Sequence, residues 1–475
     1  MQEYLHANYD EVLQAIKRFE KMLSTDKIEY FDVHQIENIY DFYFDKNKIK
    51  KAGQVLNIGL KQHPGAASLI VKKAMHLAEQ GELDAALKML ESVAAIESTN
   101  PDVFLTMGWI MLQKGKISKA LEYYWQAVNS AYDEQEEVLL EVSYNLNQHE
   151  LYLESVTFLK VLLKQAPNNE SALFEYAFSL DKNLEYKKSI AAYKRLLTIN
   201  PFSENGWYNL GVIYSKLGLH EEAGKAYAYT LAINPKHPEA HFNSGNSLVQ
   251  SGFFAEALDA YTEHLALGDD GPLVYQYIGD CWEQLGNYPL AIRFYQQVIK
   301  IAPKQADAWY GLGTTLMETD KFEDGLQAID QAIAINPLNA DYWFAHARGL
   351  FELEKTEDAA RSLENGLNLD PSELSGWFEL LKLKIILNKD FDIEAYVLSL
   401  HDQNGEMAAI HYLTSVAYYH YLDCKDKALL PLREAIYMDA DGLKTLADDY
   451  PDMVADKDIE ILINSIINRE SNKNE

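Results

Sequence analysis

Two histidines have the spacing of a metal site. His237 and His241 stand four residues apart, which would put both imidazoles on one face of a helix. However, Pro238 lies between them at a place where a helix begins, and His241 fills a position that tryptophan takes elsewhere in the chain. We therefore predict structural roles for both side chains and no metal site.

Other residues that could carry chemistry lack the rest of a motif. Gly311, Leu312 and Gly313 could open a phosphate-binding loop, but the remainder of that fingerprint is missing. Cys281 and Cys424 are far apart in the sequence and fit neither a disulfide framework nor a zinc motif, and we predict that Cys281 is a buried helix thiol. Because no nucleophile, acid or base falls into a defined arrangement, we predict no catalytic residues and no cofactor, and hence no enzyme.

Composition narrows the range of partners. The 475 residues include 42 Lys and Arg against 72 Asp and Glu, which gives a net charge of −30 and a pI near 4.8. Nucleic acid is excluded as a partner, because phosphate binding needs clustered basic residues. The acidic excess has two interpretations: it keeps the protein soluble, or it attracts basic or neutral segments of other proteins.

The N-terminal sequence and the hydropathy of the chain bear on the cellular compartment of the protein. Met1 to Leu23 mixes charged and apolar residues, without the apolar core and cleavage site of a secretion signal. No stretch has the ~18 consecutive apolar residues of a membrane span. We expect a cytoplasmic protein that does not insert into membranes.

The elements that position these residues follow from a repeat of 34 residues. Aligned on itself at that offset, the chain brings mostly small residues into register, and the spacing is 35 at only two joints. The series is Ala52, Ala86, Ala120, Ser155, Ser189, Ala223, Ala257, Ala291, Gly325, Ala359, Ile393 and Ala428. A second small residue stands twelve positions earlier in many units, so each unit has two places where paired helices can approach closely.

Large residues around these positions recur at helical spacing, twice per unit. Trp207, Leu210 and Tyr214 mark one amphipathic helix and Tyr227 marks the next. Glycine stands between the two helices in several units, where a left-handed residue ends the first helix at no steric cost. These glycines are Gly81, Gly115, Gly218, Gly252 and Gly286. Proline follows the second helix, at Pro64, Pro167, Pro201, Pro235, Pro303, Pro337 and Pro371.

This pattern resembles the tetratricopeptide repeat, whose 34 residues carry W-x2-L-G-x2-Y, then A-x3-F, then P. Its positions are matched here by Trp207, Leu210, Gly211, Tyr214, Ala223, Tyr227 and Pro235. The resemblance covers about 410 residues and implies an all-α fold, a right-handed α-solenoid superhelix of about eleven to twelve helical hairpins with capping helices. We expect Trp207 to lie in the core, where truncation to alanine would cost about 3–5 kcal/mol.

We predict three regions. Residues 1–30 form an N-terminal capping region, residues 31–440 the repeat solenoid, and residues 441–475 a C-terminal capping helix with a frayed tail. Tyr9 to Leu23 and Ile459 to Ile467 are the expected terminal helices. In the unit that begins near Ser375, Ile393 takes a place that normally needs a small side chain, so we expect its second helix to pack at a wider distance.

The resemblance also implies that the first helix of each unit lines a concave wall, through positions 2, 5, 9, 12 and 13. Candidate partner-groove residues are Trp109, Tyr144, Phe174, Phe178, Tyr208, Phe242, Asn246, Asp280, Tyr310, Phe344, Arg348 and Phe378. Aromatic side chains at position 5 could form a stepped track for an extended peptide. Alternatively, they are ordinary for the family and pack on the next helix.

Charge at the same positions bears on the kind of partner. Acidic residues outnumber basic ones on the expected wall, which favours basic or neutral segments. A related use of such repeats, the clamp for acidic chaperone tails, needs Lys at position 5 and Asn at position 9. Asn246 stands at a position 9, but Phe242 is its position 5 and none of the nine units compared has lysine there. We predict no such clamp.

The sequence thus predicts a non-catalytic scaffold or adaptor that holds a partner segment in its concave groove. Two alternatives stay open. The chain could be a structural element that self-assembles through its outer faces or ends, or a non-catalytic subunit that delivers substrate to an enzyme.

Overall fold

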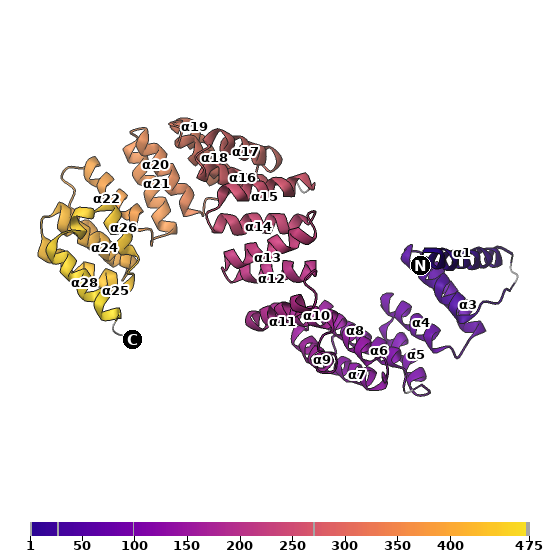
Figure 1. Ribbon diagram of the computed structural model, residues 1–475. Coiled ribbons are helices and arrows are strands. Elements are labelled where there is room, and N and C mark those ends of the chain that lie inside the picture. Colours follow the sequence, from indigo (N-terminus) through magenta and orange to yellow (C-terminus); the bar gives the residue numbers. More distant parts are fainter. Residues whose placement is uncertain (1, 26–27, 98, 269–270, 472–475) are drawn as a thin grey trace. The chain divides into compact units, whose positions relative to one another are not determined.

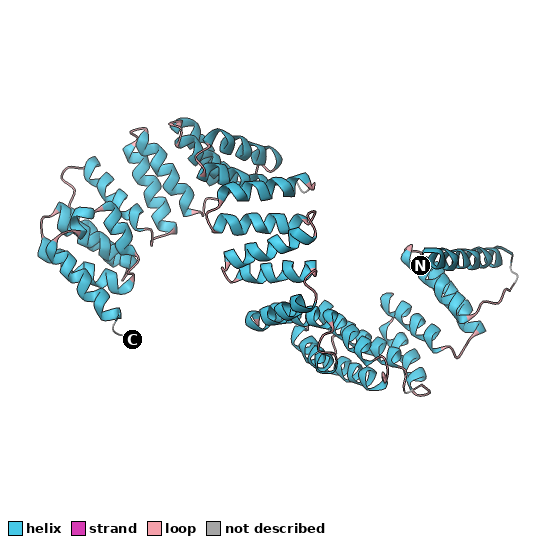
Figure 2. Cartoon of the chain, viewed as in Figure 1, coloured by secondary structure: helices cyan, strands magenta, loops and turns pink. Residues whose placement is uncertain are grey.

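The computed structural model describes all residues except 1, 26–27, 98, 269–270 and 472–475. The described residues form 28 α-helices and one π-helical turn, with no strand among them (Figures 1 and 2). The all-α solenoid predicted from the sequence is confirmed. The chain divides into two compact units, Met1–Ile233 and Asn234–Glu475, and each is described by itself.

The first unit holds thirteen helices. They are α1 (Gln2–Thr25), α2 (Val33–Asp45), α3 (Ile49–Gln62), α4 (Ala67–Glu79), α5 (Leu83–Ala94), α6 (Pro101–Gln113), α7 (Ile117–Ser130), α8 (Gln135–Gln148), α9 (Tyr152–Gln165), α10 (Glu170–Lys182), α11 (Tyr186–Ile199), α12 (Glu204–Lys216) and α13 (His220–Ile233). From α2 onward, successive helices pack as hairpins, α2 on α3, α4 on α5, and so on to α12 on α13.

The second unit continues the pattern of hairpins. Its elements are α14 (Pro238–Gln250), α15 (Phe254–Ala266), α16 (Pro272–Gln284), α17 (Tyr288–Ile301), α18 (Ala306–Met317), α19 (Phe322–Ile335), α20 (Ala340–Glu352), α21 (Thr356–Leu369), α22 (Leu374–Leu387), α23 (Ile393–Asn404), α24 (Ala408–Val416), η1 (Ala417–Tyr421), α25 (Lys425–Met438), α26 (Gly442–Asp449), α27 (Pro451–Val454) and α28 (Lys457–Ser471).

Small side chains hold each hairpin closed. The residues of the 34-residue series are buried, with the exception of Ile393, which is partly exposed. The earlier small position fits against the second helix as well: a Cβ on Gly245 would come within 2.5 Å of the Tyr261 ring. The predicted close approach of paired helices is therefore confirmed, and in that hairpin it depends on glycine.

The turn between the two helices needs a left-handed residue in every regular unit. The five glycines predicted for it all have positive φ, from 69° at Gly115 to 85° at Gly81. Five other units place a residue with a Cβ at the same position with φ near 60°, namely Asn47, Glu150, Leu184, Asp320 and Glu354. The positive φ of the turn residue is thus imposed by the packing of the repeat and does not require glycine, because residues with a Cβ adopt it as well, at a conformational cost.

The joint between hairpins is tied by a side chain from the next helix. The indole N–H of Trp207, Trp309, Trp343 or Trp377 donates to the carbonyl of the proline six residues earlier, at 2.9 Å in each case. Trp207 itself is partly exposed and stacks on Tyr229, with ring centroids 4.2 Å apart. Trp207 packs against the buried cluster of α10 to α13 and also covers the joint, so the predicted core position is confirmed only in part.

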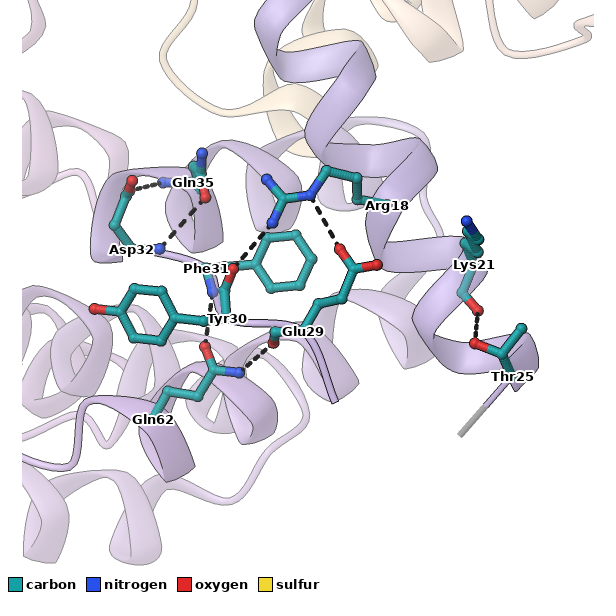
Figure 3. A network of polar contacts seen from close by, with 9 residues as sticks. All are labelled: Arg18, Lys21, Thr25, Glu29, Tyr30, Phe31, Asp32, Gln35 and Gln62. Carbon is teal, nitrogen blue, oxygen red and sulfur yellow. Dashed lines mark hydrogen bonds and ion pairs between the residues drawn. The ribbon is translucent and has the colours of Figure 1, made fainter. Parts of the chain in front are cut away.

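At the N-terminus, α1 is tied to the first hairpin by a network around the segment before α2 (Figure 3). Arg18 forms an ion pair with Glu29 at 3.0 Å and donates to the Tyr30 carbonyl. The Gln62 side chain accepts from the Phe31 N–H and donates to the Glu29 carbonyl. Phe19 and Phe31 are fully buried beneath this network. Helix α1 contains the helix predicted for Tyr9 to Leu23.

The C-terminal end of the second unit departs from the repeat. Helix α22 packs more closely on α24 and α26 than on α23, in agreement with the wider packing expected from Ile393. The contact that remains includes the Lys384 ammonium of α22, 5.5 Å from the centre of the Tyr396 ring on α23. The extra residue of the last 35-residue spacing is taken up where α24 passes into η1, a π-helical turn. Helices α26 and α27 then fold back, while α28 packs on α25. The predicted frayed tail lies, from residue 472 on, outside the described residues.

Buried apolar side chains fall into six clusters along the described chain. In chain order they lie among α1–α4, α4–α10, α10–α13, α14–α17, α17–α19 and α18–α28. Each hairpin therefore buries its apolar face on its neighbours and not in a shared centre, as expected of stacked repeats.

Candidate functional site

Three cavities open on the first helices of consecutive hairpins. One, of about 270 Å³, lies on α4, α6 and α8 and is lined by Met75, Trp109 and Glu141 among others. The other two, of about 260 and 410 Å³, lie on the inner helices of the second unit, from α18 to α22, and share Arg348 and Glu379. Their linings combine residues at the positions that the family resemblance assigned to the concave wall, such as Met75, Trp109 and Arg348, with neighbouring residues such as Glu141 and Glu379.

The candidate residues of the first unit are partly accessible. Trp109 lines the cavity on α4, α6 and α8, and Tyr144 is 43% exposed on the next inner helix. Phe178 is partly buried, with the Lys182 ammonium 5.4 Å from its ring centre. These three side chains come from successive first helices, α6, α8 and α10.

Three aromatic residues at position 5 pack within their own hairpin. Phe174 lies 5.9 Å from Tyr193, Tyr208 lies 6.0 Å from Tyr227, and Phe242 lies 5.9 Å from Tyr261, measured between ring centroids. Each is only partly exposed. These contacts agree with the alternative that the aromatic residues pack on the neighbouring helix, and the rings are only partly accessible on the wall.

The position-9 side chains Asn246 and Asp280 are held by tyrosines from the second helix. The Tyr261 hydroxyl donates to Asn246 at 2.7 Å, and the Tyr295 hydroxyl donates to Asp280 at 2.8 Å and to Glu283 at 2.7 Å. Burial raises the pKa of Asp280 to about 6, and the nearby Glu283 and Asp307 carboxylates add to the shift, while the Tyr295 hydrogen bond opposes it.

Tyr310, Phe344 and Arg348 are brought together in one cavity, the one of about 260 Å³. Phe344 is partly buried, and the Arg348 side chain is 53% exposed and pairs with Glu318. Phe378, one repeat further on, is fully buried and meets Tyr450 edge-on at 5.1 Å between ring centroids. Its ring therefore faces another part of the same chain and not an open groove.

Several carboxyl groups on these walls are desolvated. Burial raises the pKa of Glu141 and Glu175 in the first unit and of Glu379 in the second. The Glu175 carboxylate accepts from the Asn147 amide at 2.9 Å, and Asp181 nearby pairs with Lys216 at 2.9 Å. Burial thus disfavours the charged forms of Glu141 and Glu175 within the wall.

The residues set aside as chemical motifs have the structural roles predicted for them. His241 Nε2 lies 2.9 Å from the Pro235 carbonyl oxygen, which reproduces the tryptophan contact of other joints. Cys281 is buried, and burial raises the pKa of its thiol to about 12, so the reactive thiolate is disfavoured. Within the described ranges, no group of three or more metal-ligating side chains comes together.

Sequence reasoning missed the tyrosines of the second helices. Tyr261 and Tyr295 lie on second helices, and their hydroxyl groups contact position-9 residues of the inner wall. Each tyrosine follows its position-9 partner by fifteen residues in the sequence. The recurring tyrosine four residues after the small residue of the series was a visible signal. Its polar partner was not, because that partner changes from unit to unit.

These features define a class, that of proteins built from stacked helical hairpins. Models of the tetratricopeptide repeat match residues 77–139, 177–238, 242–306 and 284–349. The chain belongs to the tetratricopeptide repeat family. Repeats of this family support protein–protein interaction in general, and the family is typically non-catalytic.

Comparison with solved structures finds similar chains at low identity. YrrB, described as a TPR protein with an unusual peptide-binding site, is 18% identical, with 39% of this chain and 96% of that chain covered and a TM-score of 0.34. A tetratricopeptide repeat protein from Parabacteroides merdae is 18% identical, with 53% and 98% covered and a TM-score of 0.40. The pilus biogenesis factor PilW is 20% identical, with 46% and 98% covered and a TM-score of 0.39. No curated protein sequence matches the chain. Throughout the part of the chain that the structure describes, no helix has the length and hydropathy to cross a bilayer.

Proposed function

We propose that this protein is a non-catalytic scaffold that holds an extended segment of a partner protein on the inner faces of its first helices. The observation that carries the proposal is the set of three cavities on those faces. Exposed apolar side chains stand at their edges, among them Met75 at 41%, Phe351 at 49% and Ile386 at 61% exposure. Such side chains gain free energy when a partner covers them.

The proposed partner segment is basic or neutral, and the site of action is the cytoplasm. The desolvated carboxyl groups of Glu141 and Glu175 support the first point. An ammonium or guanidinium group brought near them would favour their charged forms, so binding and ionisation would stabilise each other. The net charge of −30 would also speed the encounter with a basic segment and slow it with an acidic one.

The test compares inner-wall variants of the full-length protein in their recovery of partners from native lysate. One variant combines Met75→Ala with Trp109→Ala, and another combines Phe351→Ala with Ile386→Ala. We expect at least one of the two to lose partners that the unaltered protein retains, because these side chains supply the accessible apolar area of the cavities. Circular dichroism of each variant checks that the helices remain.

The matched control removes apolar area of similar size outside the wall. Phe202 and Leu338 lie at joints between hairpins and are 80% and 76% exposed. Phe202→Ala combined with Leu338→Ala should leave partner recovery unchanged. If the joint variant loses partners and both inner-wall variants keep them, the groove proposal is wrong and an outer-face interaction takes its place.

A further inference from the structure

One inner-wall position already holds an aromatic side chain, supplied by the chain itself. Tyr450 lies against Phe378 with ring centroids 5.1 Å apart at 87°, and the Lys382 ammonium is 5.0 Å from the centre of the Tyr450 ring. Phe378 and Lys382 are positions 5 and 9 of the first helix α22. The Tyr450 ring therefore makes an edge-to-face aromatic contact with Phe378 and a cation–π contact with Lys382, and both contacts are attractive.

The surrounding elements are arranged to keep Tyr450 in this seat. Helix α26 packs on α22 and α24, and Gly442 at its start lies so close to the Tyr412 ring that a Cβ at this position would overlap it. His420 of the π-helical turn η1 also lies against Tyr450, with ring centroids 4.8 Å apart. Only 7% of Tyr450 stays exposed.

A similar pair, an aromatic ring followed four residues later by a cation, recurs one repeat earlier, and no described aromatic side chain is seated on it in the way that Tyr450 is seated on Phe378 and Lys382. Phe344 and Arg348 hold positions 5 and 9 of α20, again four residues apart, and they line the cavity of about 260 Å³. Across the described residues, no aromatic ring lies over the Arg348 guanidinium, which pairs with Glu318 and is 53% exposed. The neighbouring cavity of about 410 Å³ extends from Arg348 to Lys382, so it reaches the edge of the occupied seat.

We infer that the Phe344 and Arg348 cavity is a seat for a tyrosine or phenylalanine side chain of a partner segment, which it receives as Phe378 and Lys382 receive Tyr450. This inference rests on the proposed function and names the side chain that the groove selects. The remainder of the segment would cross the adjoining cavity, where Phe351 and Ile386 offer apolar contact. The chain's own tyrosine cannot fill both seats, because it is buried in the first.

The test uses full-length protein to select from a phage-displayed library of random twelve-residue peptides. Selected peptides should share an aromatic residue, and its replacement by alanine in a synthetic fluorescent copy should weaken binding by about tenfold or more. Arg348→Ala in the protein should weaken the same peptide about three- to tenfold, while Arg348→Lys, which copies the occupied seat, should stay within about twofold. Arg348 is exposed, so its replacement should not unfold the hairpin.

Arg361→Ala is the matched control, since Arg361 lies on α21 of the same hairpin, is 71% exposed and pairs with Asp358. It should leave peptide affinity unchanged. Peptides that lack an aromatic residue, or that bind equally well to the Arg348→Ala protein, overturn the aromatic seat. If such peptides still depend on Phe351 and Ile386, the groove survives and only the seat fails. If no selected peptide depends on any inner-wall residue, both proposals are wrong.

Discussion

Asp280 is a residue of the inner wall whose carboxyl group is costly to ionise in the folded protein. Its carboxyl group is buried beside Glu283 and Asp307, and only the Tyr295 hydroxyl donates to it among the hydrogen bonds of the described residues. The pKa is about 6 in the folded protein, against 3.8 for an ordinary aspartate. Between these two pH values the folded protein therefore binds more protons at this site than the unfolded chain does. The contribution of Asp280 to stability must fall as the pH rises through that window.

Asp280→Asn should consequently raise the thermal unfolding midpoint at pH 7, by an amount equivalent to about 1–2 kcal/mol, and change it little at pH 4. The asparagine oxygen can still accept from Tyr295, so the hairpin should keep its shape. Scanning calorimetry at the two pH values measures the difference. Asp259→Asn, an exposed change on α15, serves as the control, and an equal effect from both variants would contradict the burial argument.

Leu184 offers a second test at the residue scale. It stands in the turn between α10 and α11 with φ of 60°, and it is 71% exposed. A leucine gains little contact there and bears the cost of the left-handed conformation. Leu184→Gly should therefore stabilise the protein by about 0.5–1 kcal/mol, seen as a higher urea midpoint. Leu217, which is 41% exposed and has φ of −91°, is the control, and Leu217→Gly should destabilise.

At the scale of elements, the joints between hairpins depend on the hydrogen bond that a tryptophan of the first helix donates to the proline carbonyl six residues earlier. Trp343→Phe keeps most of the ring and removes the donor to the Pro337 carbonyl. We expect a loss of about 1 kcal/mol, together with faster amide exchange at the start of α20. Trp282→Phe is the comparison, because its indole nitrogen makes no hydrogen bond to any described residue. Equal losses from the two variants would mean that ring area, and not the joint contact, is responsible.

The regular hairpins could be predicted from the sequence because helix period, small residues and proline all agree on them. The left-handed turns were found only where glycine marks them, and Leu184 or Glu354 gave no local signal. The aromatic track was predicted from position alone, yet the packing of Phe174, Tyr208 and Phe242 depends on tyrosines that lie in the second helices. The return of α26 onto α22 could not be read from periodicity, since the repeat has ended before that segment.

At the scale of the whole molecule, the net charge of −30 lowers the stability of the folded state through repulsion among the acidic residues. Like charges repel more strongly in the compact state than in the expanded chain, and salt screens this repulsion. Raising sodium chloride from about 20 to 200 mM should therefore raise the unfolding temperature measured by circular dichroism. A fall would indicate that ion pairs such as Lys425 with Asp456, at 2.8 Å, outweigh the general repulsion.

The separation of the apolar interior into six clusters has a consequence for how damage and binding spread. Each cluster can open by local unfolding while clusters several hairpins away stay folded. A destabilising substitution should therefore lower the stability of its own region and leave distant hairpins unchanged. A segment bound at Arg348 should then slow amide hydrogen exchange only in α18 through α28. Exchange in α1 to α4 should stay unchanged. Hydrogen–deuterium exchange measured along the chain would therefore locate the binding site of an unidentified partner.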